Sequence, residues 1–187
     1  MKKLLLFAAI VGIVLAGCNK IKDATSKKFT VNDVKFNFTA NVDNGVAAVA
    51  SGITRAGTAN SFTVTRTVNI SELGSSELEE YANKISNVVV NSSLINVKIV
   101  PEGSYTVSNL TVSAAGVSGS LVVPSYTVGG AFTPPSNMLT YTATLIMKLI
   151  EAKSLTVTVS GDTDAPVGTT VNISYENDLI FTASLLN

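Results

Sequence analysis

The sequence predicts a mainly β protein, an antiparallel β-sandwich with one or two short helices. Apolar residues recur at every second position through most of the chain, which is the period of a strand with one buried face. Val and Thr are abundant, and both residue types favour pleated, half-buried surfaces. Turn-forming residues separate these segments at short intervals, as is typical of all-β domains.

The first half of the chain predicts three strands and a hairpin partner. Residues 34–40 alternate apolar and polar side chains, and after the turn signal Asp43-Asn44-Gly45 residues 46–51 are expected to return as a hairpin partner. Residues 62–70 alternate in the same way. A further strand is expected at residues 95–99, before the turn signal Pro101-Glu102-Gly103.

The later strands carry irregularities. The strand that begins at Tyr105 continues out of phase at Leu110, which predicts a bulge near Ser108-Asn109. The strand at residues 121–128 contains Pro124, which lacks an N–H group, so it is expected at a sheet edge.

Two strands are expected to end the chain. Residues 155–159 form the first of them. Residues 171–185 place apolar side chains on odd positions, which predicts one long strand or a strand interrupted at Glu176-Asn177.

Two segments depart from the strand period. Ser76-Glu77-Leu78-Glu79 has the pattern of a capping box, and apolar residues follow at helical spacing, so a helix is predicted over residues 77–86. Residues 137–152 favour a helix after Ser136, but their alternating Thr residues leave a strand open. An immunoglobulin-like topology also stays open, although the antibody-type signature is absent, because the chain has neither a Cys pair nor Trp.

The composition excludes several function classes. The 187 residues include no His and one Cys, so there is no Ser-His-Asp or Cys-His catalysis, no imidazole metal site and no intramolecular disulfide. Thirteen basic and thirteen acidic side chains give a net charge of zero, which argues against a nucleic-acid partner. We expect no cofactor.

The N-terminal segment has the features of a bacterial export signal, in the usual order. Met1-Lys2-Lys3 is a basic start, and residues 4–16 are an apolar run of the length of a signal-peptide core. Leu15-Ala16-Gly17-Cys18 follows and resembles the lipobox of bacterial lipoproteins. The alternatives are an uncleaved anchor helix or an ordinary secretory signal with a chance Cys.

The resemblance implies that the Cys18 thiol receives a diacylglycerol and becomes the first mature residue. Residues 1–17 are then the signal peptide, residues 18–28 the lipidated Cys and a flexible tether, and residues 29–187 a single domain. Asn19 is not the Asp that retains some lipoproteins in the inner membrane, so the outer membrane is expected, on either side. The pattern is similar to small Bacteroidota lipoproteins of uncharacterised function.

Acidic residues offer two candidate sites. Glu77, Glu79 and Glu80 crowd the first turns of the predicted helix, where they complement its dipole and lack the spacing of a glycosidase pair. Asp162 and Asp164 follow the pattern of a turn, with calcium coordination as the alternative.

Three residues are the candidates for binding: Arg66, Tyr126 and Phe132. Strict alternation places Arg66 on an apolar face, where a charge needs a partner or a route to solvent. A bulge, or an edge strand along which the stem reaches solvent, is the favoured interpretation, and a carboxylate partner or a ligand cavity is the alternative. Tyr126 and Phe132, with Tyr105 and Tyr141, offer either core packing or a surface for sugars. Phe132 lies in a Gly- and Pro-rich segment, residues 129–135, that predicts a loop.

These features predict a lipid-anchored envelope protein that acts in binding, adhesion or scaffolding, through a protein or glycan ligand, and is not an enzyme. A carrier of a hydrophobic ligand is the first alternative, because the high apolar content and the low charge permit a cavity between sheets or beneath helices. An enzyme that uses carboxylates is the second alternative.

Overall fold

Eight antiparallel strands and two helices make up the fold in the computed structural model, which describes residues 25–43, 60–91, 96–100, 105–128 and 132–185. The strands are β1 (Ser26–Asp43), β2 (Asn60–Asn69), β3 (Ile85–Val90), β4 (Asn96–Val100), β5 (Thr106–Ala114), β6 (Leu121–Thr127), β7 (Ser154–Thr163) and β8 (Thr170–Ser184). The helices are α2 (Ser76–Tyr81) and α3 (Met138–Ala152), with 3-10 turns η1 (Ile70–Leu73) and η2 (Ala82–Lys84).

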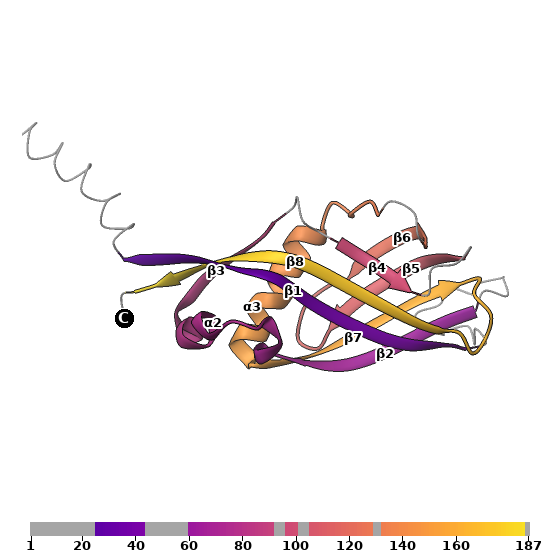
Figure 1. Cartoon of the computed structure of the whole chain (residues 1–187), viewed down its shortest axis with the longest axis horizontal. Helices are drawn as coiled ribbons and strands as arrows, with labels where there is room; N and C mark the ends of the chain where they lie inside the picture. Colours follow the sequence, from indigo (N-terminus) through magenta and orange to yellow (C-terminus); the bar gives the residue numbers. More distant parts are fainter. Residues whose placement is uncertain (1–24, 44–59, 92–95, 101–104, 129–131, 186–187) are drawn as a thin grey trace, which may run out of the picture.

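All these strands belong to one sheet, in the order β3-β8-β1-β2-β7-β5-β6 (Figure 1). Strand β8 pairs along one side with two strands. Its first half pairs with β4 and its second half with β3. One edge of the sheet is therefore shared by β3 and β4, and the other edge is β6. The edge position predicted from Pro124 is confirmed, since the strand that contains it is β6.

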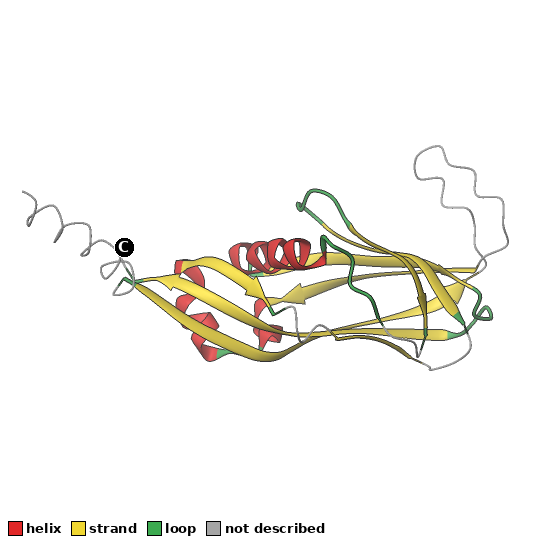
Figure 2. Ribbon diagram, turned by 90° about the horizontal axis from the view of Figure 1, so that it is seen from above, coloured by secondary structure: helices red, strands yellow, loops and turns green. Residues whose placement is uncertain are grey.

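The mainly β prediction is confirmed, but the two-sheet sandwich is not. The strands form a single curled sheet, and α3 lies along one side of it (Figure 2). Strands β1 and β2 pair only through Val42↔Phe62 and Asp43↔Ser61, so they separate beyond this corner. Alternation in a strand identifies a buried face, but it does not say whether a second sheet or a helix covers that face.

The inner face of the sheet and one face of α3 form the core. Buried residues of α3 recur at helical spacing, and they include Ile146, Leu149 and Ile150. The strand alternative for this segment is wrong, because it forms a helix on which Thr142 is buried whereas Thr140 is exposed. At Gly161 an added Cβ would lie 2.9 Å from the buried ring of Phe62, so glycine is what allows this cross-strand packing.

The first helix differs from the prediction. Its N-cap is Ser75, whose hydroxyl oxygen accepts a hydrogen bond from the backbone N–H of Leu78 at 3.2 Å, rather than Ser76. The helix ends at Tyr81, and β3 begins at Ile85 after a 3-10 turn, so the predicted range 77–86 is too long. The β-branched residues after Ile85 favour a strand.

The remaining strand predictions have mixed outcomes. The bulge is confirmed, because pairing of β5 shifts between Ser108 and Thr111 and Asn109 has a positive φ of 52°. Strand β8 runs through Glu176-Asn177 without interruption. Strand β1 already includes residues 26–28, which the sequence assigned to the tether. The predicted hairpin partner at residues 46–51 lies outside the described residues.

Candidate functional site

An apolar cavity of about 100 Å³ lies between α3 and the inner face of the sheet. Every described strand except β3 contributes to its lining, as do α3 and Phe132 in the segment before α3. Among the described residues that line the cavity none is charged, and Thr142 and Tyr175 are the only ones with a side-chain hydroxyl. Such a site can hold an apolar group through burial of hydrocarbon surface.

The curl of the sheet explains where this cavity forms. Val97 of β4 and Leu121 of β6 lie on opposite edges of the sheet, yet both belong to one apolar cluster with Met138 of α3. The N-terminal part of α3 therefore closes the seam between the two edges. Many lining side chains on the strands are valines, which are short and leave space between the sheet and the helix.

Tyr175 is the unusual residue of the lining. Its ring stacks against Phe36, with centroids 6.4 Å apart and an interplanar angle of 21°. Its hydroxyl is buried and has no hydrogen-bond partner of good geometry among the described residues. Burial raises the pKa of Tyr175 to about 12, and the Thr142 hydroxyl acts in the opposite direction. A buried hydroxyl without a hydrogen bond lowers the free energy of unfolding by about 1–3 kcal/mol. Tyr at this position therefore needs a physical explanation.

The raised pKa of Tyr175 predicts a loss of stability in base. The unfolded chain releases this proton near the ordinary pKa of 10.0, whereas the folded protein keeps it up to about 12. The free energy of unfolding therefore decreases as the pH rises from 10 to 12, by up to about 2 kcal/mol from this group. Denaturant titrations of the wild type and of Tyr175→Phe should differ in this window, and an equal pH dependence of the two proteins would contradict the assignment.

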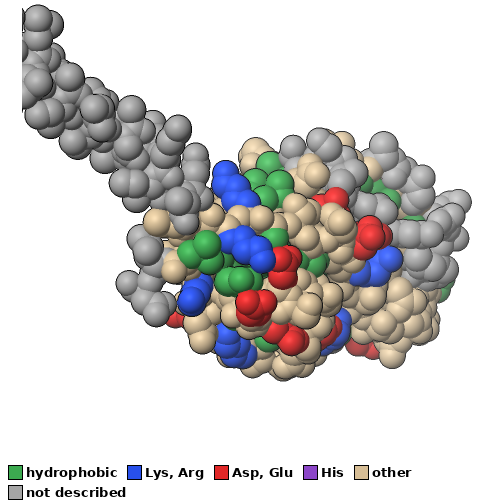
Figure 3. Space-filling view, turned by 60° about the vertical axis from the view of Figure 1, so that its left-hand side comes forward, with side chains coloured by type: hydrophobic (Ala, Val, Ile, Leu, Met, Phe, Trp, Pro, Cys, Tyr) green, Lys and Arg blue, Asp and Glu red, His purple; other side chains and the backbone are tan. Residues whose placement is uncertain are grey.

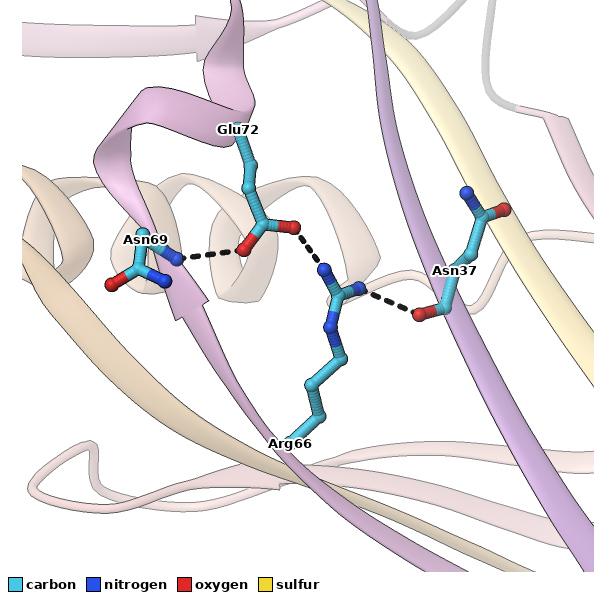
Figure 4. A network of polar contacts seen from close by, with 4 residues as sticks. All are labelled: Asn37, Arg66, Asn69 and Glu72. Carbon is cyan, nitrogen blue, oxygen red and sulfur yellow. Dashed lines mark hydrogen bonds and ion pairs between the residues drawn. The ribbon is translucent and has the colours of Figure 1, made fainter.

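Arg66 bridges the two strands that separate at the corner of the sheet (Figure 4). Its guanidinium donates to the carbonyl oxygen of Asn37 in β1 at 2.7 Å and forms an ion pair with Glu72 in η1. Glu72 also accepts from the backbone N–H of Asn69 at 2.9 Å. The Arg66 Cζ lies 5.9 Å from the centroid of the Phe38 ring. The structure thus provides a carboxylate partner, pairing of β2 with β7 is regular at Arg66, so no bulge occurs there, and Arg66 does not line the cavity.

We expect the Arg66–Glu72 pair to contribute modestly to stability, because the two side chains are 36% and 26% exposed. A double-mutant cycle with Arg66→Gln and Glu72→Gln should give a coupling energy of about 1 kcal/mol in urea unfolding. A coupling energy of zero would show that Arg66 acts only through Asn37 and the stacking of its side chain.

The aromatic candidates divide between core and cavity. Phe132 packs edge-on against Tyr126, with ring centroids 5.7 Å apart, and Phe132 also lines the cavity. Tyr105, Tyr126 and Tyr141 are each 8% exposed, so they do not form an open surface for sugars.

The sequence missed the lining residues on α3 and Tyr175 on β8. The signal for Tyr175 was a lone aromatic hydroxyl in a run of apolar odd positions. The α3 residues gave no signal beyond the apolar spacing of a helix, which any buried helix shares.

The acidic candidates have structural roles. Asp162 lies in β7 rather than in a turn, and its carboxylate accepts from the side-chain amide of Asn109 at 2.8 Å. Asp164 accepts from the backbone N–H of Thr106 at 2.7 Å. Glu77 of α2 pairs with Lys27. Within the described residues no group of three potential metal ligands occurs.

Charges of both signs lie close together on the end of the molecule that Figure 3 presents. Neither helix in the described ranges is long and apolar enough to cross a bilayer. Cys18 lies outside those ranges. Comparisons with protein families, with curated proteins and with solved structures found no match.

Proposed function

We propose that this protein is a lipid-anchored protein of the bacterial envelope whose folded domain holds a hydrophobic ligand between the sheet and α3. The observation that carries the ligand is the uncharged, almost wholly apolar lining of the cavity. It favours the carrier alternative within the broader expectation of a binding protein. Adhesion and scaffolding stay predictions that no feature of the described residues favours over ligand binding.

The anchoring half of the proposal is supported by the lipobox-like Leu15-Ala16-Gly17-Cys18 behind a basic start and an apolar run. Asn19 favours the outer membrane. Two or three acyl chains on Cys18 would hold the protein stably at a membrane, because each buried methylene contributes roughly 0.8 kcal/mol. A carrier anchored in this way would lie next to the membrane, where apolar ligands are concentrated.

The volume of the cavity limits what enters it. A dry apolar cavity of about 150 Å³ holds one benzene molecule, so a cavity of about 100 Å³ holds a smaller group or part of a chain. Helix α3 forms one wall, and the sheet forms most of the rest. A longer ligand therefore fits only in part, and the rest of it extends beyond this volume. We expect binding without chemical change, because the described lining residues include no charged acid or base.

Native mass spectrometry of the protein purified from its host membrane tests the proposal. We expect a co-purified apolar molecule in the wild type and its loss in Val123→Phe, which fills the cavity from β6. Val88→Phe is the matched control, because Val88 is 5% exposed and Val123 4%, and β3 does not line the cavity. Overpacking costs both variants about 1–3 kcal/mol. Equal ligand content in all three proteins would refute a ligand in this cavity.

A further inference from the structure

Among the described residues the buried Tyr175 hydroxyl at the cavity has no hydrogen bond of good geometry, and the Thr142 hydroxyl lies close enough to interact with it. Phe at this position would keep the stacking against Phe36 and would remove a buried polar atom whose hydrogen bonding is incomplete. Buried hydroxyls without partners are rare in folded proteins, and they call for a water, an ion or a ligand atom. A tyrosine phenol is protonated at neutral pH, so the Tyr175 hydroxyl is available as a hydrogen-bond donor.

A second hydroxyl lies on the opposite wall. Thr142 of α3 is 7% exposed and lines the cavity together with Tyr175 of β8. The rest of the lining is hydrocarbon and aromatic rings. Polar groups are thus few in an otherwise apolar site, as in sites where a small number of polar atoms orient a mostly apolar ligand.

The charges around Tyr175 restrict the ligand further. Its neighbour Glu176 pairs with Lys35 at 3.2 Å and is not part of the lining. No Lys or Arg of the described ranges lines the cavity, so a carboxylate bound there would be buried without a counter-charge from them. Burial of an unpaired charge is far more costly than burial of a neutral hydroxyl or ester.

We propose that the cavity selects a neutral amphiphile, an apolar chain with one uncharged oxygen that accepts a hydrogen bond from Tyr175 and faces Thr142. This inference rests on the proposed function and adds the chemical class of the ligand. A water molecule is the competing occupant. Buried water needs two to four polar partners. The two hydroxyls of the described lining meet only the lower limit of that range.

Three probes of equal chain length test this class: octane, octan-1-ol and octanoate at pH 8. Affinities are measured for the full chain in amphipol, with protein-free amphipol as the blank. We expect the wild type to bind octan-1-ol most tightly and octanoate most weakly. Tyr175→Phe should lower the affinity for octan-1-ol roughly three- to tenfold, as loss of one hydrogen bond predicts, and should leave the affinity for octane unchanged.

Tyr141→Phe is the matched control, because Tyr141 is buried on α3 and does not line the cavity, and its affinities should match the wild type. Thr142→Val keeps the side-chain shape but removes the hydroxyl. Like Tyr175→Phe, it should lower the affinity for octan-1-ol. Tightest binding of octanoate, or equal effects of Tyr175→Phe on octane and octan-1-ol, would overturn the ligand class alone. If none of the probes binds the wild type, the proposed function fails with it.

Discussion

Leu149→Ala is expected to lower the free energy of unfolding by about 2–5 kcal/mol and to create a larger binding site. Leu149 is 2% exposed on α3 and forms part of the cavity lining. Truncation removes its buried methyl groups and joins the space they leave to the existing 100 Å³. The enlarged site approaches the size of cavities that bind benzene. Benzene should therefore raise the melting temperature of this variant more than that of the wild type.

Leu78→Ala is the control for this experiment. Leu78 is 1% exposed on α2, and it does not line the cavity. Its truncation should cost a comparable amount of stability, but benzene should not restore that loss, because the new space is separate from the site. If benzene stabilises both variants equally, the effect does not report on the cavity beneath α3.

The sequence predicted which side chains face inward more successfully than what covers them. In β1 and β8 the alternation identified the buried positions, as Phe38 and Phe181 show. Alternation is a local property, whereas the curl of the sheet depends on how long β1 and β8 are and where β2 leaves β1. Helix α3 was ambiguous for the same reason, since its Thr residues alternate as in a strand and only packing against the sheet decides between the two.

The candidate site was less predictable than the fold. The position of Arg66 correctly indicated a charge that needs a partner, but Glu72 was not recognised because it lies in a 3-10 turn after the strand. The cavity itself has no sequence pattern, because it is the space left when valine side chains on a curled sheet meet one helix. In the sequence Tyr175 differs from its neighbours only as an aromatic hydroxyl among apolar positions, and the structure adds that this hydroxyl is buried without a hydrogen bond of good geometry among the described residues.

The proposed lipid anchor predicts that substitution of Cys18 has a large effect on acylation and processing in the cell. Cys18→Ser should abolish incorporation of labelled fatty acid and leave residues 1–17 attached, because the thiol is the proposed acceptor and the chain has no other Cys. The described domain begins at residue 25, so its free energy of unfolding should not change. Gel mobility and intact mass report the retained segment, and metabolic labelling reports the acyl chains.

The double substitution Cys18→Ser with Lys20→Cys supplies the matched control, because it keeps one Cys in the chain but moves it by two positions. We expect no labelling, since Asn19 rather than a small residue would stand directly before the thiol. Labelling of this variant would mean that any Cys near the apolar run is acylated. A wild-type protein that begins at a residue other than Cys18, or carries no acyl chain, would remove the anchor. The affinities of the cavity would then still decide independently whether the domain binds apolar ligands, because the lining residues lie in the folded part of the chain.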